Sequence, residues 1–205
     1  MSLARPGRAH LKEARRVKKV TQGPQTWLYP LPTLVIGAMV NGKPNFMTAA
    51  FGGLANGKPP MLSVGIVRSR YTWGAFKLGA AFSVNIPSAA QAREVDFCGL
   101  ESGSKTDKVE RCGFKVFYGD LETAPLIEQC PVNLECVVAH IIDLEMHSLV
   151  IADIKQTHVS EDCLTDGAFD PMKVDPLIYL TGPVRKYVRA GEVVGVPFKT
   201  GLDLK

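Results

Sequence analysis

Short apolar runs of strand length follow one another along most of the chain and are separated by Gly, Pro and Asn. The first run, TLVIGAMV from Thr33 to Val40, is followed by Asn41-Gly42, a dipeptide typical of a tight β-hairpin. A return strand is therefore predicted over Asn45–Phe51. Further apolar runs predict strands over Met61–Val67, Ala80–Ile86, Val132–Leu144, Leu149–Val159 and Leu177–Leu180.

Helical segments are fewer and shorter than these strands. We expect one over Trp73–Leu78 with Thr72 as its N-cap, one from Ser88 to Gly99, and a short one ending near Cys112 that has Thr106 or Asp107 as its N-cap. The stretches 52–60 and 160–176 are predicted to be loops. Because strands outnumber helices and the first two form a hairpin, the pattern predicts a mainly β fold, an antiparallel β-barrel with a few helices.

Composition and charge bound the organisation of the chain. Its 205 residues are 46% hydrophobic, enough for one domain with a substantial core. Seven of the 24 Lys and Arg residues lie in residues 1–19 against one acidic residue, whereas the remaining 17 basic and 19 acidic residues nearly balance. We therefore divide the chain into a basic arm, residues 1–22, and one domain, residues 23–205. The arm is typical of a solvated tail. Aromatic and basic residues do not alternate, as they would on a surface that binds nucleic acid, so nucleic acid is not favoured as a partner.

Cysteine usage and hydropathy indicate a compartment. The five cysteines are scattered without a CxxC pair, which is typical of reduced thiols, although the close spacing of Cys130 and Cys136 leaves a disulfide open. No apolar run approaches the ~20 residues of a membrane-spanning helix, and charges interrupt the start of the chain. The sequence therefore predicts a cytoplasmic protein without a membrane partner.

Common nucleotide and hydrolase motifs are absent from the sequence. It has no GxGxxG after a strand, no GxxxxGK[ST], no GxSxG and no HExxH. His140, His147 and His158 lack a spacing useful for metal binding, so no metal is predicted. What remains is two turns rich in hydroxyls and cations, RSRYT (68–72) and SGSKTDK (102–108). Either turn can attract an anion such as phosphate, but spacing alone favours a plain capped helix.

Six segments between about Tyr29 and about Leu180 follow one another in a recognisable order. They are YPLPTLVIGAMVNGKPNFMTAAFGG, SRYT, AFSVNIPS, CGLESGSKTDK, CPVNLECVV and DPLIYL. In this order they resemble the flavin reductase-like family of FMN-binding split barrels, and within it the flavoredoxin-type members. The resemblance implies a six-stranded antiparallel split β-barrel with short peripheral helices, a homodimer, and FMN bound non-covalently near the dimer interface.

The same resemblance implies a set of cofactor-binding residues. Asn45 and the backbone of Met47, Thr48 and Ala49 are expected along the isoalloxazine ring, with Phe51 closing one side and Tyr179 covering the ring. The phosphate or ribityl chain is expected at Ser69, Tyr71 and Thr72, and Lys108 is expected at the phosphate or the ring edge. Ser83 and Asn85 are expected near the ring or ribityl chain, and His147 beside the flavin. Phe51 departs from relatives that carry Trp, and Arg70 adds a charge beside the expected phosphate.

Three functions follow as hypotheses. The first is an oxidoreductase that transfers electrons from NAD(P)H through bound FMN to a redox partner or small-molecule acceptor. Because the flavin carries the chemistry, no catalytic residue is assigned, with His147 the one candidate. The second is a flavoredoxin-type electron carrier without pyridine-nucleotide chemistry. The third is a non-enzymatic scaffold whose basic arm binds nucleic acid.

Overall fold

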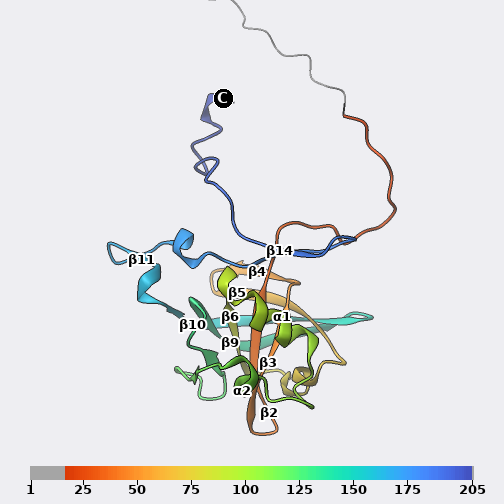
Figure 1. Cartoon of the computed structure of the whole chain (residues 1–205), viewed down its shortest axis with the longest axis vertical. Coiled ribbons are helices and arrows are strands. Elements are labelled where there is room, and N and C mark those ends of the chain that lie inside the picture. Colours follow the sequence, from red (N-terminus) through yellow and green to blue (C-terminus); the bar gives the residue numbers. More distant parts are fainter. Residues whose placement is uncertain (1–16, 205) are drawn as a thin grey trace, which may run out of the picture.

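The computed structural model describes residues 17–204 (Figure 1). Most of the predicted basic arm, residues 1–16, lies outside the described residues, and residues 17–22 are exposed and without regular structure. The remainder is mainly β with few helices, as predicted from the pattern. The strands are β1 Leu31–Pro32, β2 Leu34–Val40, β3 Lys43–Ala49, β4 Gly52–Gly57, β5 Pro60–Val67, β6 Ala81–Ile86, β7 Val116–Phe117, β8 Leu126–Ile127, β9 Val132–Asp143, β10 His147–Val159, β11 Leu164–Thr165, β12 Ala168–Phe169, β13 Ile178–Leu180 and β14 Lys186–Val188. The α-helices are α1 Ala92–Leu100 and α2 Lys108–Cys112, and the 3₁₀ turns are η1 Tyr71–Ala75, η2 Ala89–Gln91, η3 Glu161–Cys163, η4 Pro171–Val174 and η5 Leu202–Leu204.

One antiparallel sheet forms the body of the molecule. Its strand order is β3-β2-β6-β9-β10-β5-β4, and β3 also comes close to β5 although the two are not hydrogen-bonded as neighbours. The β2–β3 hairpin turns at Asn41 and Gly42, whose φ angles of 50° and 75° place both residues in the left-handed region. This is the turn that the Asn-Gly dipeptide predicted. The sheet is split rather than closed, and β3 is one of its two end strands.

The sheet has seven strands where six were expected. The additional strand is β4, in a stretch that was predicted to be an irregular loop. Despite its glycines, β4 pairs with β5 from Gly52↔Val64 to Gly57↔Pro60, with a bulge between Leu54 and Asn56. Backbone hydrogen bonds to a neighbouring strand hold this segment extended, although its side chains give no strand pattern.

Alternate residues of the hairpin face two different cores. Leu34 and Ile36 of β2, with Met47 of β3, pack inside the barrel against β5, β6, β9 and β10. Val35 and Phe46 point to the other face, where they pack under α1 and α2. Because side chains alternate along a strand, β2 and β3 carry apolar residues on both faces and read as continuous apolar runs. Figure 1 shows both α-helices beside β3, at the end of the main sheet.

Two helix predictions are confirmed and one is wrong. The predicted helix from Ser88 is present as η2 followed by α1, and Asp107 caps α2 by accepting from Val109 N (2.9 Å) and Glu110 N (3.2 Å). The segment after Arg70 forms only the 3₁₀ turn η1, with Arg70 and not Thr72 at its N-cap. Thr72 lies within the turn, where its buried hydroxyl accepts a hydrogen bond from Asn45 instead of capping the backbone.

A small sheet covers the end of the barrel next to β3. It has the order β1-β13-β14 and joins the start of the domain to its C-terminal part. β13 is the last strand that the sequence predicted, whereas β14 was not predicted. Figure 1 shows the segments before β1 and after β14 extending from this side of the molecule. β14 lies close to the candidate site described below.

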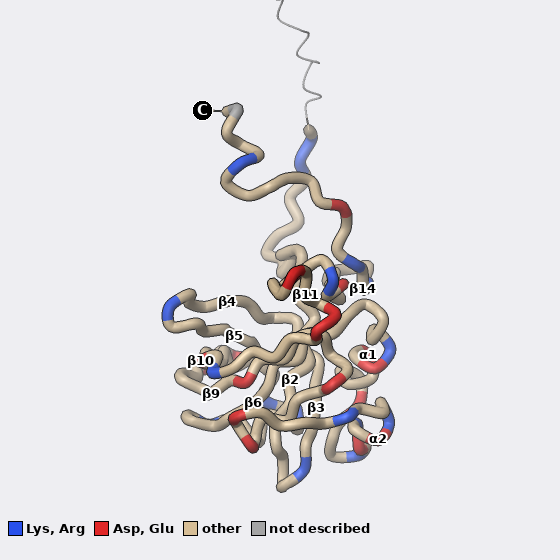
Figure 2. Tube along the Cα trace, turned by 90° about the vertical axis from the view of Figure 1, so that its left-hand side faces the viewer, with Lys and Arg blue, Asp and Glu red and all other residues tan. Residues whose placement is uncertain are grey.

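The cysteines are free, and Cys130 and Cys136 are each buried without a disulfide between them. Within residues 17–204 no helix is long and apolar enough to cross a membrane. Lys, Arg, Asp and Glu are interspersed over the sheet and helices (Figure 2). Local groupings of charge are therefore more informative than the net charge of the domain.

Candidate functional site

The candidate site lies along the outer edge of β3. Because β3 ends the main sheet, the backbone groups that point away from β2 have no strand neighbour. The carbonyl oxygen of Phe46 is one of them, since it accepts a hydrogen bond from Lys108 of α2. In an antiparallel strand such groups recur at every second residue, so the N–H and C=O of Thr48 face the same edge.

The polar pocket lies at one end of this edge and has a volume of about 190 Å³. Its walls come from β3, from the turn 69–72, and from the end of α1 with the loop after it. The lining residues are Met47, Thr48, Ser69, Arg70, Tyr71, Thr72, Cys98, Glu101, Ser102, Gly103 and Lys108. Hydroxyl and cationic groups from segments far apart in sequence therefore converge on one small volume, as phosphate recognition requires.

Lys108 occupies the base of the polar pocket. Its side chain is buried, and its amino group donates to Phe46 O and to Cys98 O, both at 2.8 Å. Burial lowers the pKa of Lys108 below its ordinary value, an effect that the nearby Arg70 charge reinforces. Two of the three amino protons thus join α1 to β3, and one remains for a ligand.

Gly103 gives the loop its close approach to the strand. A Cβ atom at this position would lie 1.8 Å from Asn45 Oδ1 and 3.0 Å from Tyr71. Asn45 is itself fixed, because its Nδ2 donates to the Thr72 hydroxyl at 2.7 Å. A further cavity of about 240 Å³ adjoins the polar pocket and is lined by Asn45, Tyr71 and residues of the loop 103–108.

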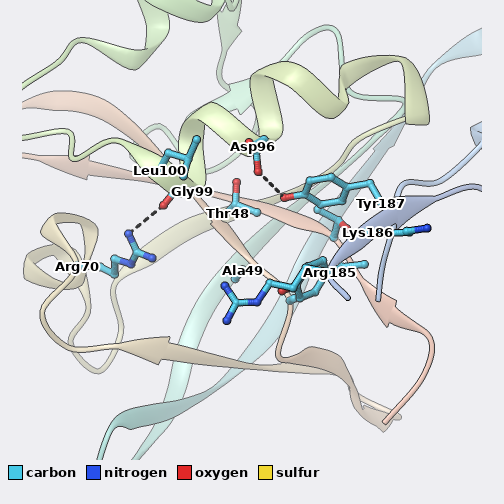
Figure 3. Close-up of a pocket in the computed structure, with 12 residues that line it drawn as sticks. Thr48, Ala49, Arg70, Asp96, Gly99, Leu100, Arg185, Lys186 and Tyr187 are labelled. Carbon is cyan, nitrogen blue, oxygen red and sulfur yellow. Dashed lines mark hydrogen bonds between the residues drawn. The ribbon is translucent and has the colours of Figure 1, made fainter. Parts of the chain in front are cut away.

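The large cavity lies at the other end of the β3 edge and has a volume of about 440 Å³ (Figure 3). It is lined by β3, α1, β13 and β14, through Thr33, Thr48, Ala49, Ala50, Arg70, Asp96, Gly99, Leu100, Tyr179, Arg185, Lys186 and Tyr187. Thr48 and Arg70 line the polar pocket as well, so the two spaces adjoin. The small side chains of Ala49 and Ala50 leave the strand accessible to a flat molecule.

Hydrogen bonds hold two walls of the large cavity in place. Arg70 donates to Gly99 O at 3.0 Å, and Tyr187 donates to Asp96 at 3.1 Å, so β14 is attached to α1 (Figure 3). Burial and the Asp96 charge raise the pKa of Tyr187 to about 12, which keeps its hydroxyl protonated as a donor. Tyr179 lies beside Tyr187, with ring centroids 5.7 Å apart.

The structure brings most of the predicted residues to these spaces. Nine of the thirteen line at least one of them: Asn45, Met47, Thr48, Ala49, Ser69, Tyr71, Thr72, Lys108 and Tyr179. Lys108 and Thr72 already form some of their hydrogen bonds within the chain. That these residues hold a cofactor remains a prediction.

Ser83 and Asn85 do not belong to this group. Both are fully buried in β6, and their polar atoms are engaged inside the chain. Ser83 donates to Pro125 O, and Asn85 donates to Val35 O while accepting from Ile127 N, at 2.9 Å each. They attach the β8 segment to the main sheet. Their expected position near the ring is therefore corrected to a structural position in the core.

Phe51 and His147 form a separate pair. Their rings are stacked with centroids 5.2 Å apart, and neither residue lines the polar pocket or the large cavity. Phe51 is partly exposed, and His147 begins β10 at the turn that joins it to β9. Within a single chain they do not enclose the site.

The residues that line the large cavity but were not found from the sequence include Thr33, Asp96, Gly99 and Leu100. Thr33 lies between β1 and β2 and belongs to an apolar strand signal, and the other three lie on a helix with ordinary composition. No local pattern marks them, because only the packing of α1 against β3 and β14 brings them to the cavity. Among residues 17–204, no group of three or more His, Cys, Asp or Glu side chains is arranged to hold a metal ion.

The comparison with protein families decides the relationship of the chain. The family described as "Flavin reductase like domain" matches residues 27–187, a range that includes the strands and helices lining the site. This chain belongs to the flavin reductase-like family. The resemblance inferred from the ordered segments is thereby confirmed, as is the split-barrel fold.

Solved structures of flavoredoxins are similar over nearly the whole chain. Flavoredoxin from Methanosarcina acetivorans is 37% identical with a TM-score of 0.85, covering 92% of this chain and 100% of that one. Flavoredoxin of Desulfovibrio vulgaris (Miyazaki F) is 33% identical with a TM-score of 0.82, covering 90% and 100%. A flavoredoxin-type member of the flavin reductase-like family is the description that these findings support.

More distant comparisons add less. Nitrilotriacetate monooxygenase component B from Bacillus cereus is 17% identical with a TM-score of 0.75, covering 88% of this chain and 98% of that one, and it shares the fold. An uncharacterized protein of Archaeoglobus fulgidus is 34% identical over 145 residues, 70% of this chain and 80% of that protein.

Proposed function

We propose that this flavin reductase-like chain is an FMN-binding oxidoreductase that passes electrons from a reduced pyridine nucleotide through the flavin to an acceptor. The observation that carries the proposal is the continuous binding surface along the β3 edge. A polar pocket with cations and hydroxyls adjoins a larger cavity with aromatic walls, and Thr48 lines both. FMN has this form, a flat heteroaromatic ring joined to a phosphate by a short polar chain.

The residues of the polar pocket fit the phosphate end. Ser69 and Ser102 supply hydroxyl groups, Arg70 supplies a guanidinium group, and Lys108 supplies its remaining amino proton. Charge-assisted hydrogen bonds to phosphate are stronger than neutral ones. Arg70 lies where the polar pocket meets the large cavity, and this position suits a ligand such as FMN that is negatively charged at one end.

The edge of β3 fits the ring end. The outward N–H and C=O groups of Thr48 match the alternating acceptors and donors of the flavin pyrimidine, while Ala49 and Ala50 permit close approach. When bound, FMN would supply the hydride and electron chemistry, so the chain needs no acid–base triad. The protein residues bind and orient the ring and limit its contact with water.

Similarity to two flavoredoxins favours a second candidate, an electron carrier without pyridine-nucleotide chemistry. The two candidates differ in the reaction of the purified holoprotein under anaerobic conditions. The first predicts that NADH or NADPH bleaches the flavin absorption band within minutes. If neither nucleotide does so while dithionite does, and the reduced protein then donates electrons to an acceptor, the carrier is the correct function. A purified protein without a flavin spectrum that also fails to bind added FMN would contradict both.

We also propose that the chain works as a homodimer. Large apolar side chains are exposed on β4, its preceding residue, the end of β9 and the β9–β10 turn, namely Phe51, Leu54, Ile142, Leu144 and Met146. Several large apolar side chains exposed on neighbouring parts of one sheet are typical of an interface. Pairing through this surface would give the Phe51–His147 pair a role beside the flavin of a second subunit, as the resemblance implies.

A further inference from the structure

The large cavity carries an excess of positive charge. Arg70, Arg185 and Lys186 line it against one carboxylate, that of Asp96. Arg70 belongs also to the polar pocket, and Figure 3 shows the Lys186 amino group directed away from the cavity. The guanidinium group of Arg185, in contrast, points into the space in front of Ala49 (Figure 3). Arg185 is therefore the cation that belongs to the large cavity itself.

The pairing of the neighbouring charges leaves Arg185 available. Asp96 accepts a hydrogen bond from the protonated Tyr187 hydroxyl at 3.1 Å. Arg189, four residues after Arg185, is held by Asp175 at 3.2 Å. In the described part of the chain Arg185 has no ion pair and no side-chain hydrogen bond. It faces the large cavity, and an arginine fork matches a phosphate or carboxylate group.

Thr33 gives an independent indication of a ligand in the same cavity. Its side chain is 2% exposed, lines the large cavity, and its Oγ1 atom has no hydrogen-bond partner within residues 17–204. A buried hydroxyl without a partner is unfavourable, because it has lost its hydrogen bonds to water. A polar ligand in the large cavity would give this hydroxyl a partner.

We infer that the large cavity selects NADPH over NADH as the electron donor, with Arg185 holding the 2′-phosphate of the adenosine ribose. This inference rests on the proposed function. In Rossmann-type sites a carboxylate binds the 2′-hydroxyl of NAD and an arginine accommodates the 2′-phosphate of NADP, and the same charge complementarity applies to other folds. Here the Oδ1 atom of Asp96 accepts from Tyr187, and the guanidinium of Arg185 has no partner within residues 17–204. The reaction served is hydride transfer: NADPH gives one hydride to oxidised FMN, solvent gives one proton, and NADP⁺ and reduced FMN result.

The first test is steady-state kinetics of the FMN-loaded protein with both nucleotides. We expect wild-type protein to have the higher kcat/KM with NADPH. Arg185→Gln should lower kcat/KM for NADPH about 10–100-fold, the loss of one charged hydrogen-bonding group, and change that for NADH less than about threefold. Arg189→Gln is the matched control, since its partner is Asp175 and it does not line the cavity; it should change neither value.

A second test measures binding without turnover. In calorimetry with the FMN-loaded protein, adenosine 2′,5′-bisphosphate should bind at least about tenfold more tightly than AMP, and Arg185→Gln should abolish the difference. Thr33→Val should weaken NADP⁺ binding without lowering the melting temperature, because the hydroxyl has no partner in the free protein.

Several results would overturn the inference. They are a wild-type preference for NADH, an equal loss for both nucleotides in Arg185→Gln, or loss of FMN itself in that variant. These outcomes differ from failure of the proposed function, in which neither nucleotide reduces the wild-type flavin at all.

Discussion

Glu135 illustrates how a single buried residue can hold a loop in place. It lies on β9 with its side chain fully buried, and its carboxylate accepts from His158 Nε2 at 2.6 Å and from the backbone N–H groups of Asp120 and Leu121. Burial opposes ionisation of this carboxyl, but the hydrogen bonds from His158 and from the backbone outweigh it and lower the pKa of Glu135. The loop before β8 is attached to the sheet through these contacts.

The lowered pKa of Glu135 predicts a loss of stability in acid. A carboxyl whose pKa is lower in the folded than in the unfolded state stabilises the fold above the unfolded value of about 4.3, and this contribution is lost as the pH falls through the folded value. Glu135→Gln should reduce the free energy of unfolding at pH 7 by about 2–4 kcal/mol and flatten its dependence on pH below about 4.3.

Urea denaturation of both proteins between pH 3 and pH 7 measures this difference. Asp153→Asn serves as the control, since Asp153 forms an exposed pair with Lys155 and should change stability by less than about 1 kcal/mol. Parallel pH curves for wild type and Glu135→Gln would contradict the assignment.

Gly103 offers a second test at the scale of one residue. The Cβ atom of alanine would overlap Asn45 Oδ1, so Gly103→Ala must displace the loop or the Asn45–Thr72 hydrogen bond. We expect FMN affinity to fall at least about tenfold, about 1.4 kcal/mol, measured by the recovery of flavin fluorescence on dilution. Gly57→Ala is the matched control, because its Cβ would meet nothing within 4 Å. Equal affinity in Gly103→Ala and wild type would separate this loop from the cofactor site.

For single residues, the sequence predicts which residue types belong to a site better than it predicts which way each side chain points. Thr48 and Ser83 are both small hydroxyl residues on strands, but Thr48 lines the site and Ser83 donates into the core. The difference depends on which strand forms the end of the sheet. That is a property of strand order, which local sequence does not contain.

Among the elements, α2 has the most direct connection to the site. This helix of five residues begins at Lys108, and its first N–H groups are capped by Asp107. Asp107→Ala should cost about 1 kcal/mol of stability and should weaken FMN binding as well, because the cap fixes the start of the helix that carries Lys108. Thermal melts and FMN titrations of Asp107→Ala and Asp162→Ala distinguish this role, since Asp162 lies in η3 away from the pocket. Unchanged FMN affinity in Asp107→Ala would show that Lys108 keeps its position without the cap.

The elements also show where sequence reasoning succeeds. The Asn41-Gly42 hairpin and the long β9–β10 pair have local signals, a turn dipeptide and alternating polar residues, and both are present. β4 and β14 have no such signal, because their extended form is imposed by a neighbouring strand in each case. β14 contributes to the large cavity, so the strand itself and the place of Tyr187 in the site could not be predicted with the rest.

For the whole molecule, the main expectation still to be measured is the proposed homodimer. We expect light scattering after gel filtration to give twice the mass of the 22.3 kDa chain. The double variant Leu54→Asp/Leu144→Asp should shift this value toward the monomer, because it places charges on the exposed apolar surface. Val184→Asp places a charge on an exposed residue just before β14, and it tests whether a charge added elsewhere on the surface also lowers the measured mass. A monomeric wild type would contradict the dimer and the proposed role of His147 with it.

The fold as a whole was the most predictable level. Mainly β architecture follows from the number and length of apolar runs, and the order of six segments is specific to the family even though each is modest alone. The seventh strand was less accessible, because β4 has a weak pattern of its own and depends on its pairing with β5.

The place of β3 at the end of the main sheet also affects how the protein will behave in the laboratory. An end strand with open N–H and C=O groups is a template on which another chain can add a strand. The same groups around Thr48 are those proposed to meet the flavin. Cofactor occupancy would then protect the protein against self-association, and preparations expressed with limited riboflavin should precipitate sooner on concentration than those saturated with FMN.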